Sequence, residues 1–474
     1  MTGLNAASLG TVPCHIKTPA YNRKNHGIGI VHLGLGAFHK AHQAFYTDAA
    51  MASDGGDWKI IGVSMRNEKI AANFNAQDGL FTLVDRGTSG ATAQIIGSIA
   101  QAFCASSQPE KVLAALCEPS MRVVTITVTE KGYGIDRASG GVDLQNPVIT
   151  HDLEQANAPV GALGLLVAAL RSRRANGCAP FTVLCCDNLP DNGAFVRNGL
   201  IDFANQWDAD LAGWIAEHVA CPSSMVDRIT PAQTPATCAL AQELTGTEDI
   251  LAIETESFHQ WVIEDHFPTG RPAWEAAGAI FTDDVAPFEK MKLRLLNGSH
   301  SLIAYLGVLH GKTYVRDVMA DPNLVALVRD HLKAAMATLP PMPDMDLAQY
   351  CDDLIERFRN PNIAHETFQI ATDGSEKLPQ RIFAPAVDAL AADQLLHAFT
   401  LASAVWMWFC RSEVHEINDP RAELLRAAAK QDTPASMLAA FEAIPGLFPE
   451  PLVKSEQWRS EVLRALDDVA KINT

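Results

Sequence analysis

The sequence lacks the residue clusters that mark metal, disulfide or acyl-transfer sites. Its ten cysteines are scattered and include no CxxC pair, so it predicts neither a zinc ribbon nor a disulfide framework. His39 and His42 form the only close histidine pair, and no HExxH motif or Cys/His cluster accompanies them. There is also no GxSxG turn and no Walker loop, which disfavours acyl and phosphoryl transfer. We therefore expect no bound metal.

Positive charge and long apolar runs are also scarce. The 474 residues include 37 Lys and Arg against 55 Asp and Glu, a net charge of −18, which disfavours a nucleic-acid partner. No apolar run is long enough to span a membrane, and no N-terminal apolar segment resembles a signal peptide. We expect a cytoplasmic protein with reduced thiols and a small-molecule partner, without a membrane partner, as a monomer or weak homodimer.

The pattern of strands and helices divides the chain into two domains, as its length requires. Apolar runs that read as strands cover 27–33, 58–64, 123–128 and 181–186, and helical stretches at 40–52 and 162–174 lie between them. This alternation predicts a mostly parallel sheet covered on both faces. Later apolar patterns are helical, over 287–309, 324–336, 390–408 and 421–430. The sequence thus predicts an α/β Rossmann-like domain over 1–284 and a mostly α-helical domain over 285–474.

A glycine-rich turn follows the first predicted strand. Gly34-x-Gly36-x-x-His39 is similar to a dinucleotide-binding fingerprint with its third glycine replaced, and it stands between a strand and a helix as that fingerprint requires. The glycines permit a tight turn and the close approach of a pyrophosphate. Gly34, Gly36, Ala37 and Phe38 are therefore predicted cofactor contacts.

The second predicted strand leads into Arg66, Glu68 and Lys69. Glu68 is placed to accept a hydrogen bond from a ribose 2′-hydroxyl, which favours NAD, whereas Arg66 or Lys69 could hold the 2′-phosphate of NADP. We expect NAD as the cofactor, with NADP as an open alternative. The other interpretation of this segment is a solvated loop of mixed charge.

Polar residues also follow the next two predicted strands. Thr129 and Glu130 follow one, and Asn188 follows the other. Because ligands of open α/β sheets bind outside the carboxyl ends of strands, Thr129 and Glu130 are predicted cofactor contacts. The amide of Asn188 could donate to a developing oxyanion, or it could cap the helix that follows. Asp227 stands in a similar, weaker polar motif.

Lys292, Asn297 and His300 bring an amine, an amide and an imidazole into one predicted helix. At about 100° per residue, Asn297 lies about 140° and His300 about 80° around from Lys292, on one broad face. Such a set can take a proton from an alcohol and hold the resulting alkoxide. The alternative is a solvated face. Gly298 within the helix and the apolar residues on either side favour burial, and buried polar groups need a partner or a function.

With these residues in view, the chain resembles the mannitol dehydrogenase family of long-chain polyol and sugar-acid dehydrogenases over nearly its whole length. Six motifs carry the resemblance: HLGLGAFHKAHQ at 32–43, TVTEKGY at 127–133, CDNLP at 186–190, MVDRI at 225–229, KLRLLNGSH at 292–300 and DGSEKLPQR at 373–381. The resemblance implies a Rossmann fold, a nicotinamide cofactor and hydride transfer without a metal.

The same resemblance assigns roles to the polar residues. It implies that Lys292 is the general base, that Asn188 and Asn297 form the oxyanion site and that His300 positions the substrate. Glu289, one turn before Lys292, matches a glutamate that passes the proton towards solvent. For Lys292 to accept a proton near neutral pH, its pKa must fall well below about 10.4, which burial and a neighbouring cation can achieve.

The substrate follows less directly from the motifs. Lys377 is an implied substrate contact, and Asp227 and Arg381 within two of the motifs are predicted to bind substrate as well. The polyol-specific branch carries an arginine at the position of Gln369, and many fructuronate reductases carry one at the position of Glu366. The expected substrate is an open-chain polyol of the mannitol and fructose type. The alternatives are a fructuronate reductase acting on D-mannonate and D-fructuronate, a non-catalytic dinucleotide-sensing module, and a zinc-dependent alcohol dehydrogenase.

Overall fold

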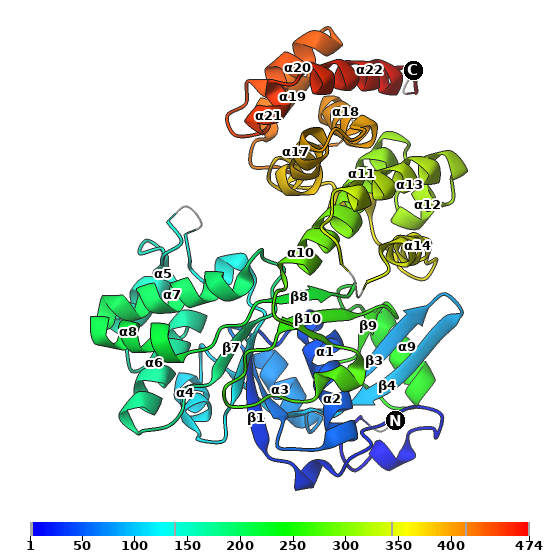
Figure 1. The fold of residues 1–474 in the computed structure, drawn as a ribbon. Coiled ribbons are helices and arrows are strands. Elements are labelled where there is room, and N and C mark those ends of the chain that lie inside the picture. Colours follow the sequence, from blue (N-terminus) through cyan, green and yellow to red (C-terminus); the bar gives the residue numbers. More distant parts are fainter. Residues whose placement is uncertain (1–2, 137–138, 343–344, 413–414, 473–474) are drawn as a thin grey trace. The chain divides into compact units, whose positions relative to one another are not determined.

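The computed structural model describes residues 3–136, 139–342, 345–412 and 415–472 (Figure 1). The chain divides into two compact units, Met1–Val285 and Ala286–Thr474. The first unit is built around a parallel sheet and the second is helical, so the predicted fold class is confirmed.

A five-stranded sheet in the order β5-β2-β1-β6-β7 forms the centre of the first unit. All neighbouring pairs are parallel. Its strands are β1 (Ile28–Leu33), β2 (Lys59–Ser64), β5 (Ile99–Cys104), β6 (Val123–Ile126) and β7 (Thr182–Cys185). The chain proceeds outward from β1 through β2 to β5 and then returns to the other side of β1 with β6. The carboxyl ends of β1 and β6 therefore flank the point where the strand order reverses, which is where ligands of such sheets bind.

Both faces of this sheet are buried, which explains why its strands are continuous apolar runs. Successive residues of a strand point to opposite faces. On β1, Val31 and Leu33 pack with residues of α4 (Pro109–Cys117), α6 (Ala162–Ala175) and α7 (Asn192–Trp207). Ile30 points the other way and packs with α2 (Gln43–Asp54) and α3 (Glu68–Ala76). Helices thus cover the sheet on two sides (Figure 1).

One helix of this unit differs from the expectation. The helix predicted over 40–52 is two helices, α1 (Ala37–Ala41) and α2 (Gln43–Asp54), because His42 leaves the helical region with φ −122° and ψ −90°. His42 is fully buried, and its Nε2 lies 3.0 Å from the Gln260 carbonyl oxygen.

Two three-stranded sheets complete the unit, β4-β3-β9 and β11-β10-β8. Their strands are β3 (Phe81–Gly87), β4 (Gly90–Ile96), β8 (Ser224–Asp227), β9 (Ile253–Thr255), β10 (Gln260–Glu264) and β11 (Ile280–Thr282).

The second unit consists of helices around a buried central helix, α11 (Gly298–Leu309), most of whose residues are buried. The longest of the others are α13 (Pro322–Ala337), α14 (Leu347–Phe358), α18 (His397–Arg411) and α22 (Glu456–Ile472). The helix predicted over 390–408 begins only at His397, because α17 (Ala384–Ala391) ends first and Asp393 has a left-handed φ of 52°. The helix predicted over 421–430 is α19 (Ala422–Ala429).

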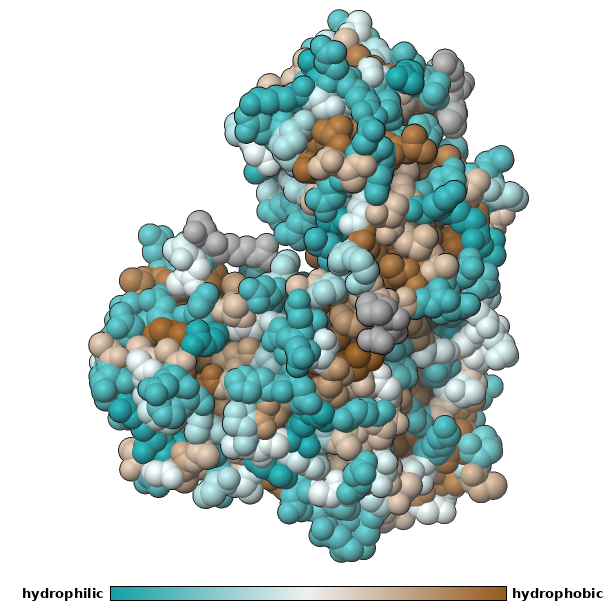
Figure 2. Space-filling model, viewed as in Figure 1, coloured by the Kyte–Doolittle hydropathy of each residue, from teal (hydrophilic) through white to brown (hydrophobic). Residues whose placement is uncertain are grey.

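Hydrophilic residues predominate on the face of the protein seen in Figure 2. In the part of the chain that the structure describes, no helix has the length and apolar character that crossing a membrane needs.

Candidate active site

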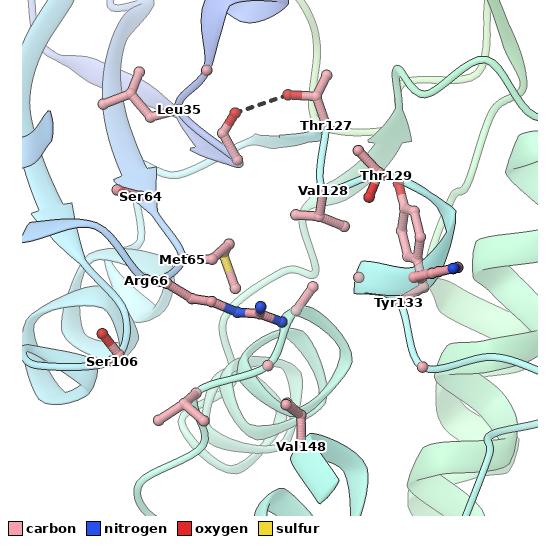
Figure 3. A pocket seen from close by; sticks show the side chains of 18 of the residues that line it. Leu35, Ser64, Met65, Arg66, Ser106, Thr127, Val128, Thr129, Tyr133 and Val148 are labelled. Carbon is pink, nitrogen blue, oxygen red and sulfur yellow. Dashed lines mark hydrogen bonds between the residues drawn. The ribbon is translucent and has the colours of Figure 1, made fainter. Parts of the chain in front are cut away.

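The glycine turn after β1 is held so tightly that only glycine fits its first position. Gly34 has a φ of +103°, and a Cβ atom there would lie 2.0 Å from the carbonyl oxygen of Thr127 at the end of β6. The amides of Gly34 and Leu35 donate to the carbonyl of Val63 on β2, at 2.9 and 3.0 Å. The Thr127 hydroxyl donates to the Gly34 carbonyl at 2.9 Å, as the dashed line in Figure 3 marks. The turn is therefore fastened to both strands beside β1.

A buried histidine supports this turn from below. His32 on β1 has its Nε2 2.9 Å from the Thr127 hydroxyl and 3.1 Å from the Gly34 carbonyl, while its Nδ1 lies 2.8 Å from the Thr125 hydroxyl. Burial lowers the pKa of His32 to about 3, so the ring is neutral near pH 7. A neutral ring with Nε2–H donates to the turn and accepts from Thr125. The ring of His39 stacks on it, with centroids 3.5 Å apart.

A pocket of about 650 Å³ opens beside this turn at the carboxyl ends of the strands (Figure 3). Its walls come from the glycine turn, the segments after β2 and β6, and the starts of α5 (Pro147–Glu154) and α6. Arg66 and Lys131 line it, and no Asp or Glu is among its lining residues. A positively charged pocket of this kind suits a ligand with phosphate groups.

The structure brings only some of the predicted cofactor residues to this pocket. Gly34, Gly36, Arg66 and Thr129 line it, whereas Ala37, Phe38, Glu68 and Glu130 do not. Glu68 is exposed in the first turn of α3, and Phe38 packs on the ring of His42, with centroids 4.9 Å apart. Of the charged residues after β2, Arg66 therefore belongs to the pocket lining and Glu68 lies outside it.

Asn188 and Asp227 stand at the carboxyl ends of two strands of this unit. Asn188 is exposed just beyond β7, and α7 begins at Asn192 with Asp191 at its N-cap position, so Asn188 does not cap this helix. Asp227 is the last residue of β8 and is buried. Asp187, which precedes Asn188, was not singled out in the sequence. Its carboxylate accepts from the amides of Val128 and Thr129 at 3.0 and 3.2 Å.

The Lys292–His300 segment of the second unit is not one regular α-helix. A π-helical turn, η5 (Leu293–Asn297), separates α10 (Ala286–Lys292) from α11. A π-turn contains more residues per turn than an α-helix, so the angles calculated from about 100° per residue do not apply. Burial is nevertheless as the apolar flanks indicated, because Lys292, Asn297 and His300 are 6%, 8% and 8% exposed. Glu289 is partly buried on α10.

Close packing at Gly298 accompanies the π-turn. A Cβ atom at Gly298 would lie 2.9 Å from Nε2 of His331 on α13 and 3.1 Å from the carbonyl oxygen of Arg381. The neighbouring Arg294 is buried and donates to the Thr338 carbonyl and hydroxyl, both at 2.7 Å, and it forms an ion pair with Asp388. These contacts fix the backbone between Lys292 and His300.

The environment of His300 is cationic. The pKa of His300 is well below its ordinary value of 6.5, first because of burial and then because of His365, Arg357, Arg381 and Lys292. Its ring packs on Phe358, with centroids 4.6 Å apart, and lies edge-on to His365 at 5.3 Å. His300 is therefore neutral at physiological pH and can donate one hydrogen bond and accept another.

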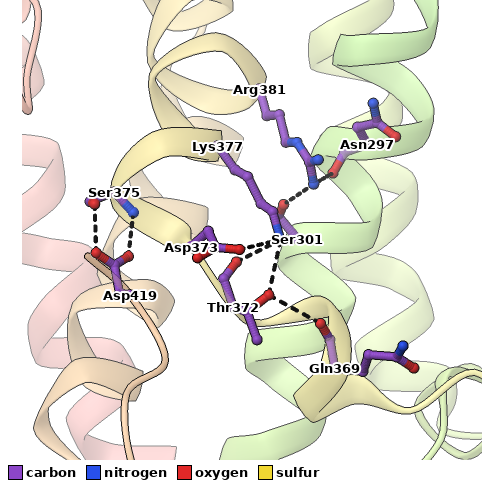
Figure 4. Close-up of polar contacts among 9 residues, drawn as sticks. All are labelled: Asn297, Ser301, Gln369, Thr372, Asp373, Ser375, Lys377, Arg381 and Asp419. Atoms are coloured by element: carbon purple, nitrogen blue, oxygen red, sulfur yellow. Dashed lines mark hydrogen bonds and ion pairs between the residues drawn. The ribbon is translucent and has the colours of Figure 1, made fainter. Parts of the chain in front are cut away.

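Two further cations extend this polar site (Figure 4). Arg381 lies in the second π-turn, η6 (Pro379–Phe383), and donates to the Ser301 hydroxyl at 3.1 Å. Lys377 donates to the carbonyl of Thr372 at 2.7 Å and lies 3.8 Å from the Asp373 carboxylate. Burial is the main cause that lowers the pKa of both Arg381 and Lys377.

Gln369 and Glu366 are exposed, unlike these cations, and lie on or just before the short helix α15 (Thr367–Ile370).

Asn297 is buried, but its Nδ2 has no hydrogen-bond partner among the described residues. A buried amide donor in that state is costly unless a ligand accepts from it.

A glycine turn at the reversal point of a parallel sheet, together with a buried amine, amide and imidazole, defines an oxidoreductase of the Rossmann type. Comparison with known proteins agrees. Residues 28–276 match the model of the mannitol dehydrogenase Rossmann domain, and residues 284–457 match that of the mannitol dehydrogenase C-terminal domain. The chain belongs to the mannitol dehydrogenase family.

Individual relatives cover nearly the whole chain. D-Mannonate oxidoreductase of Escherichia coli is 39% identical over 96% of this chain and 96% of its own length. Mannitol 2-dehydrogenase of Cereibacter sphaeroides is also 39% identical, over 93% of this chain and 94% of its own. A solved structure of Pseudomonas fluorescens mannitol 2-dehydrogenase, a ternary complex with NAD and D-mannitol, is 36% identical with a TM-score of 0.84, covering 100% of this chain and 98% of that one. The protein is thus a dehydrogenase. Its sequence is equally similar to a mannonate oxidoreductase and to a mannitol dehydrogenase.

Proposed function

We propose that this protein is a metal-independent, NAD-dependent dehydrogenase that interconverts a secondary alcohol and a ketone on an open-chain polyol of the mannitol and fructose type. The observation that carries the proposal is the buried set of Lys292, His300 and the unpartnered amide of Asn297. A buried amine, a neutral imidazole and a donor without an acceptor suit a polyhydroxylated substrate whose hydroxyl must lose a proton.

The residues around the glycine turn fit a dinucleotide. Gly34 packs so closely on Thr127 that a Cβ would collide with its backbone, and such a tight glycine turn at the end of the first strand suits the binding of a pyrophosphate. Arg66 and Lys131 supply positive charge to the same pocket. A related structure contains NAD, and we infer that NAD binds here, with Gly34, Gly36, Arg66 and Thr129 among its contacts. When bound, the nicotinamide ring accepts the hydride from the carbinol carbon.

The protein supplies the proton chemistry. Lys292 Nζ, in its neutral form, takes the hydroxyl proton as the carbon–hydrogen bond breaks, and Glu289 passes this proton onward. The amides of Asn297 and Asn188 donate to the oxygen as it gains negative charge. His300 orients the substrate by a hydrogen bond, since its lowered pKa keeps it neutral. Asp227, Lys377 and Arg381 are proposed substrate contacts. Atoms and charge balance: alcohol and NAD⁺ give ketone, NADH and one proton.

A sugar acid is the second candidate substrate, for one specific reason. Arg357, Arg381 and Lys292 all contribute positive charge at His300. In the described part of the chain no carboxylate forms an ion pair with Arg381, and Gln369 is uncharged. A substrate carboxylate, such as that of fructuronate, would meet this charge favourably.

A panel of reductions tests the proposal and separates the two substrates. NADH and NADPH consumption is measured with fructose, fructuronate, tagaturonate and xylulose. The proposal predicts NADH-dependent reduction of fructose that survives extended treatment with EDTA. A value of kcat/KM for fructuronate that exceeds that for fructose at least about tenfold would assign the sugar acid instead. Loss of activity on chelation, restored by zinc, would contradict the metal-independent mechanism.

A further inference from the structure

One backbone position at the cofactor pocket is strained. Thr129, directly after β6, has φ 64° and ψ 160°. This region of backbone conformation is populated almost only by glycine, because a Cβ atom crowds the adjacent peptide. In the described part of the chain, the other non-glycine residues with positive φ are all aspartates, Asp78, Asp191, Asp373 and Asp393. Thr129 alone is β-branched, which makes its conformation the most costly of the set.

A single carboxylate holds this segment in place. Asp187 Oδ2 accepts from the Val128 amide at 3.0 Å and from the Tyr133 hydroxyl at 2.7 Å, and its Oδ1 accepts from the Thr129 amide at 3.2 Å. Tyr133 is 1% exposed, and its oxygen also lies 2.9 Å from Sγ of Cys185. Hydrogen bonds to a carboxylate are about twice as strong as those between neutral groups. Three of them converge here on the strained turn.

Two hydrogen bonds to the backbone carbonyl of Asp187 hold this residue in place. Its carbonyl accepts from the Leu189 amide at 2.9 Å and from Nδ2 of Asn192 at 3.0 Å. On the other side of the strained residue, the Thr129 carbonyl accepts from the Gly132 amide at 2.9 Å. The turn therefore has little freedom to relax, and the strain at Thr129 persists.

This turn forms one wall of the cofactor pocket. The lining residues from this turn are Val128, Thr129, Gly132 and Tyr133. Figure 3 shows Val128, Thr129 and Tyr133 together on one side of the pocket. The amides of Val128 and Thr129 are occupied by Asp187, so neither of them is available to a ligand in this pocket. When the wall is already ordered before the ligand binds, the free energy of binding is not reduced by the entropic cost of ordering this segment.

We propose that Asp187 is a positioning residue of the cofactor site: it holds Thr129 in a strained conformation and so shapes the pocket wall before the dinucleotide binds. The proposal rests on the proposed function, because it takes the ligand of this pocket to be NAD. It assigns Asp187 no contact with cofactor or substrate.

The test measures NADH binding to the full-length protein by quenching of its intrinsic fluorescence, together with Tm. Asp187→Asn keeps the size of the side chain but replaces one acceptor oxygen by a donor, and we expect it to raise the Kd for NADH about tenfold. Asp249→Asn is the matched control. Asp249 is buried, whereas Asp187 is partly buried, but it likewise accepts three hydrogen bonds, from Gln77, Thr82 and Leu251, away from the pocket. We expect it to lower Tm while leaving Kd within about twofold.

A double-mutant cycle with Thr129→Gly separates positioning from general stability. Glycine adopts this conformation without strain, so the wall no longer depends on Asp187 to the same degree. We expect Asp187→Asn to raise Kd less than about threefold in the Thr129→Gly background, against about tenfold in the wild-type background. Equal effects in both backgrounds, or an effect no larger than that of Asp249→Asn, would overturn the proposal.

Two outcomes keep the inference distinct from the function on which it rests. If Asp187→Asn does not fold, Tyr133→Phe removes one of the three donors and is expected to raise Kd about threefold; an unchanged Kd would overturn the proposal. If the wild-type protein itself fails to bind NADH, the proposed function fails. If the wild type binds NADH but Asp187→Asn raises Kd equally in the wild-type and Thr129→Gly backgrounds, only the positioning role of Asp187 fails.

Discussion

At the scale of single residues, burial decides which side chains stay neutral. Burial lowers the pKa of His32 to about 3 and that of His300 well below 6.5, and neighbouring cations add to the effect at His300. Both rings therefore act as hydrogen-bonding groups with a fixed charge of zero near pH 7. His32 supports the glycine turn, and His300 is available to a substrate hydroxyl.

Cofactor choice is also decided by single residues. Arg66 lines the pocket and Glu68 does not, so we expect Arg66 to influence the preference between NADH and NADPH. Arg66→Ala should raise the KM for NADPH at least about tenfold, with a smaller rise for NADH, because an arginine holds a 2′-phosphate through two charged hydrogen bonds. Steady-state kinetics with both cofactors measure this.

Glu68→Gln is the matched variant for that experiment, since it removes a charge two residues from Arg66, at the start of α3 and outside the pocket lining. It should leave the NADH to NADPH ratio nearly unchanged. A larger shift of the ratio in Glu68→Gln than in Arg66→Ala would restore the interpretation drawn from the sequence, in which Glu68 accepts from the ribose.

At the scale of elements, an irregular turn of the helix positions the proposed catalytic residues of the second unit. The π-turn over Leu293–Asn297 separates Lys292 from His300, and Gly298 at its end lets α13 and the Arg381 carbonyl approach. π-Turns inside α-helices occur frequently at functional sites, because they change the direction of the side chains on either side. Here the change falls between the proposed base and the residue that positions the substrate.

Gly298→Ala tests the role of this turn. The added methyl group would lie 2.9 Å from His331 Nε2 and 3.1 Å from the Arg381 carbonyl oxygen, so the His331 ring, α13 or the π-turn must shift. We expect kcat to fall at least about tenfold while the Kd for NADH stays within about twofold, because the cofactor pocket is formed by other residues. Gly213→Ala on α8 (Ala209–His218) is the control, since a Cβ there meets nothing within 4 Å. Normal kcat in Gly298→Ala would show that the close packing is not functional.

The elements also show what the sequence could and could not predict. Four of the five strands of the parallel sheet were located to within two residues, because strands buried on both faces are continuous apolar runs, whereas β5 was not predicted. The break at His42 and the π-turn after Lys292 were missed, because apolar periodicity assumes a regular helix. Burial of Lys292 could be predicted from its apolar flanks. The role of Asp187 could not, since its partners Val128, Thr129 and Tyr133 are more than fifty residues away.

At the scale of the whole molecule, buried histidines make stability depend on pH. His32, His39, His300 and His331 are all buried with lowered pKa values. On acidification below about 6.5, the unfolded chain binds protons at these rings and the folded chain does not, so stability falls as pH falls. Asp48, Asp187 and Glu442 act in the opposite direction, because burial raises their pKa values, that of Asp48 to about 6. Among the described residues these three carboxyl groups oppose six histidines with lowered pKa values, since His259 and His365 add to the four buried rings.

We therefore expect Tm to fall by at least about 5 °C between pH 7 and pH 5. His39→Gln should reduce this dependence, because it removes one buried ring whose pKa is lowered. The exposed His15 provides the control, and His15→Gln should leave the profile unchanged. Differential scanning calorimetry across this range measures both. A Tm that is constant or rises towards pH 5 would contradict this account of the buried rings.

The most direct test of the central claim is the turnover of Lys292→Ala. If Lys292 is the general base, this variant should lose at least about 10²-fold in kcat for oxidation of the polyol, while its Kd for NADH stays close to that of the wild type. Lys290→Ala removes an exposed lysine from the same helix and should retain normal kcat. A Lys292→Ala variant with kcat within a few-fold of wild type would contradict the proposed mechanism.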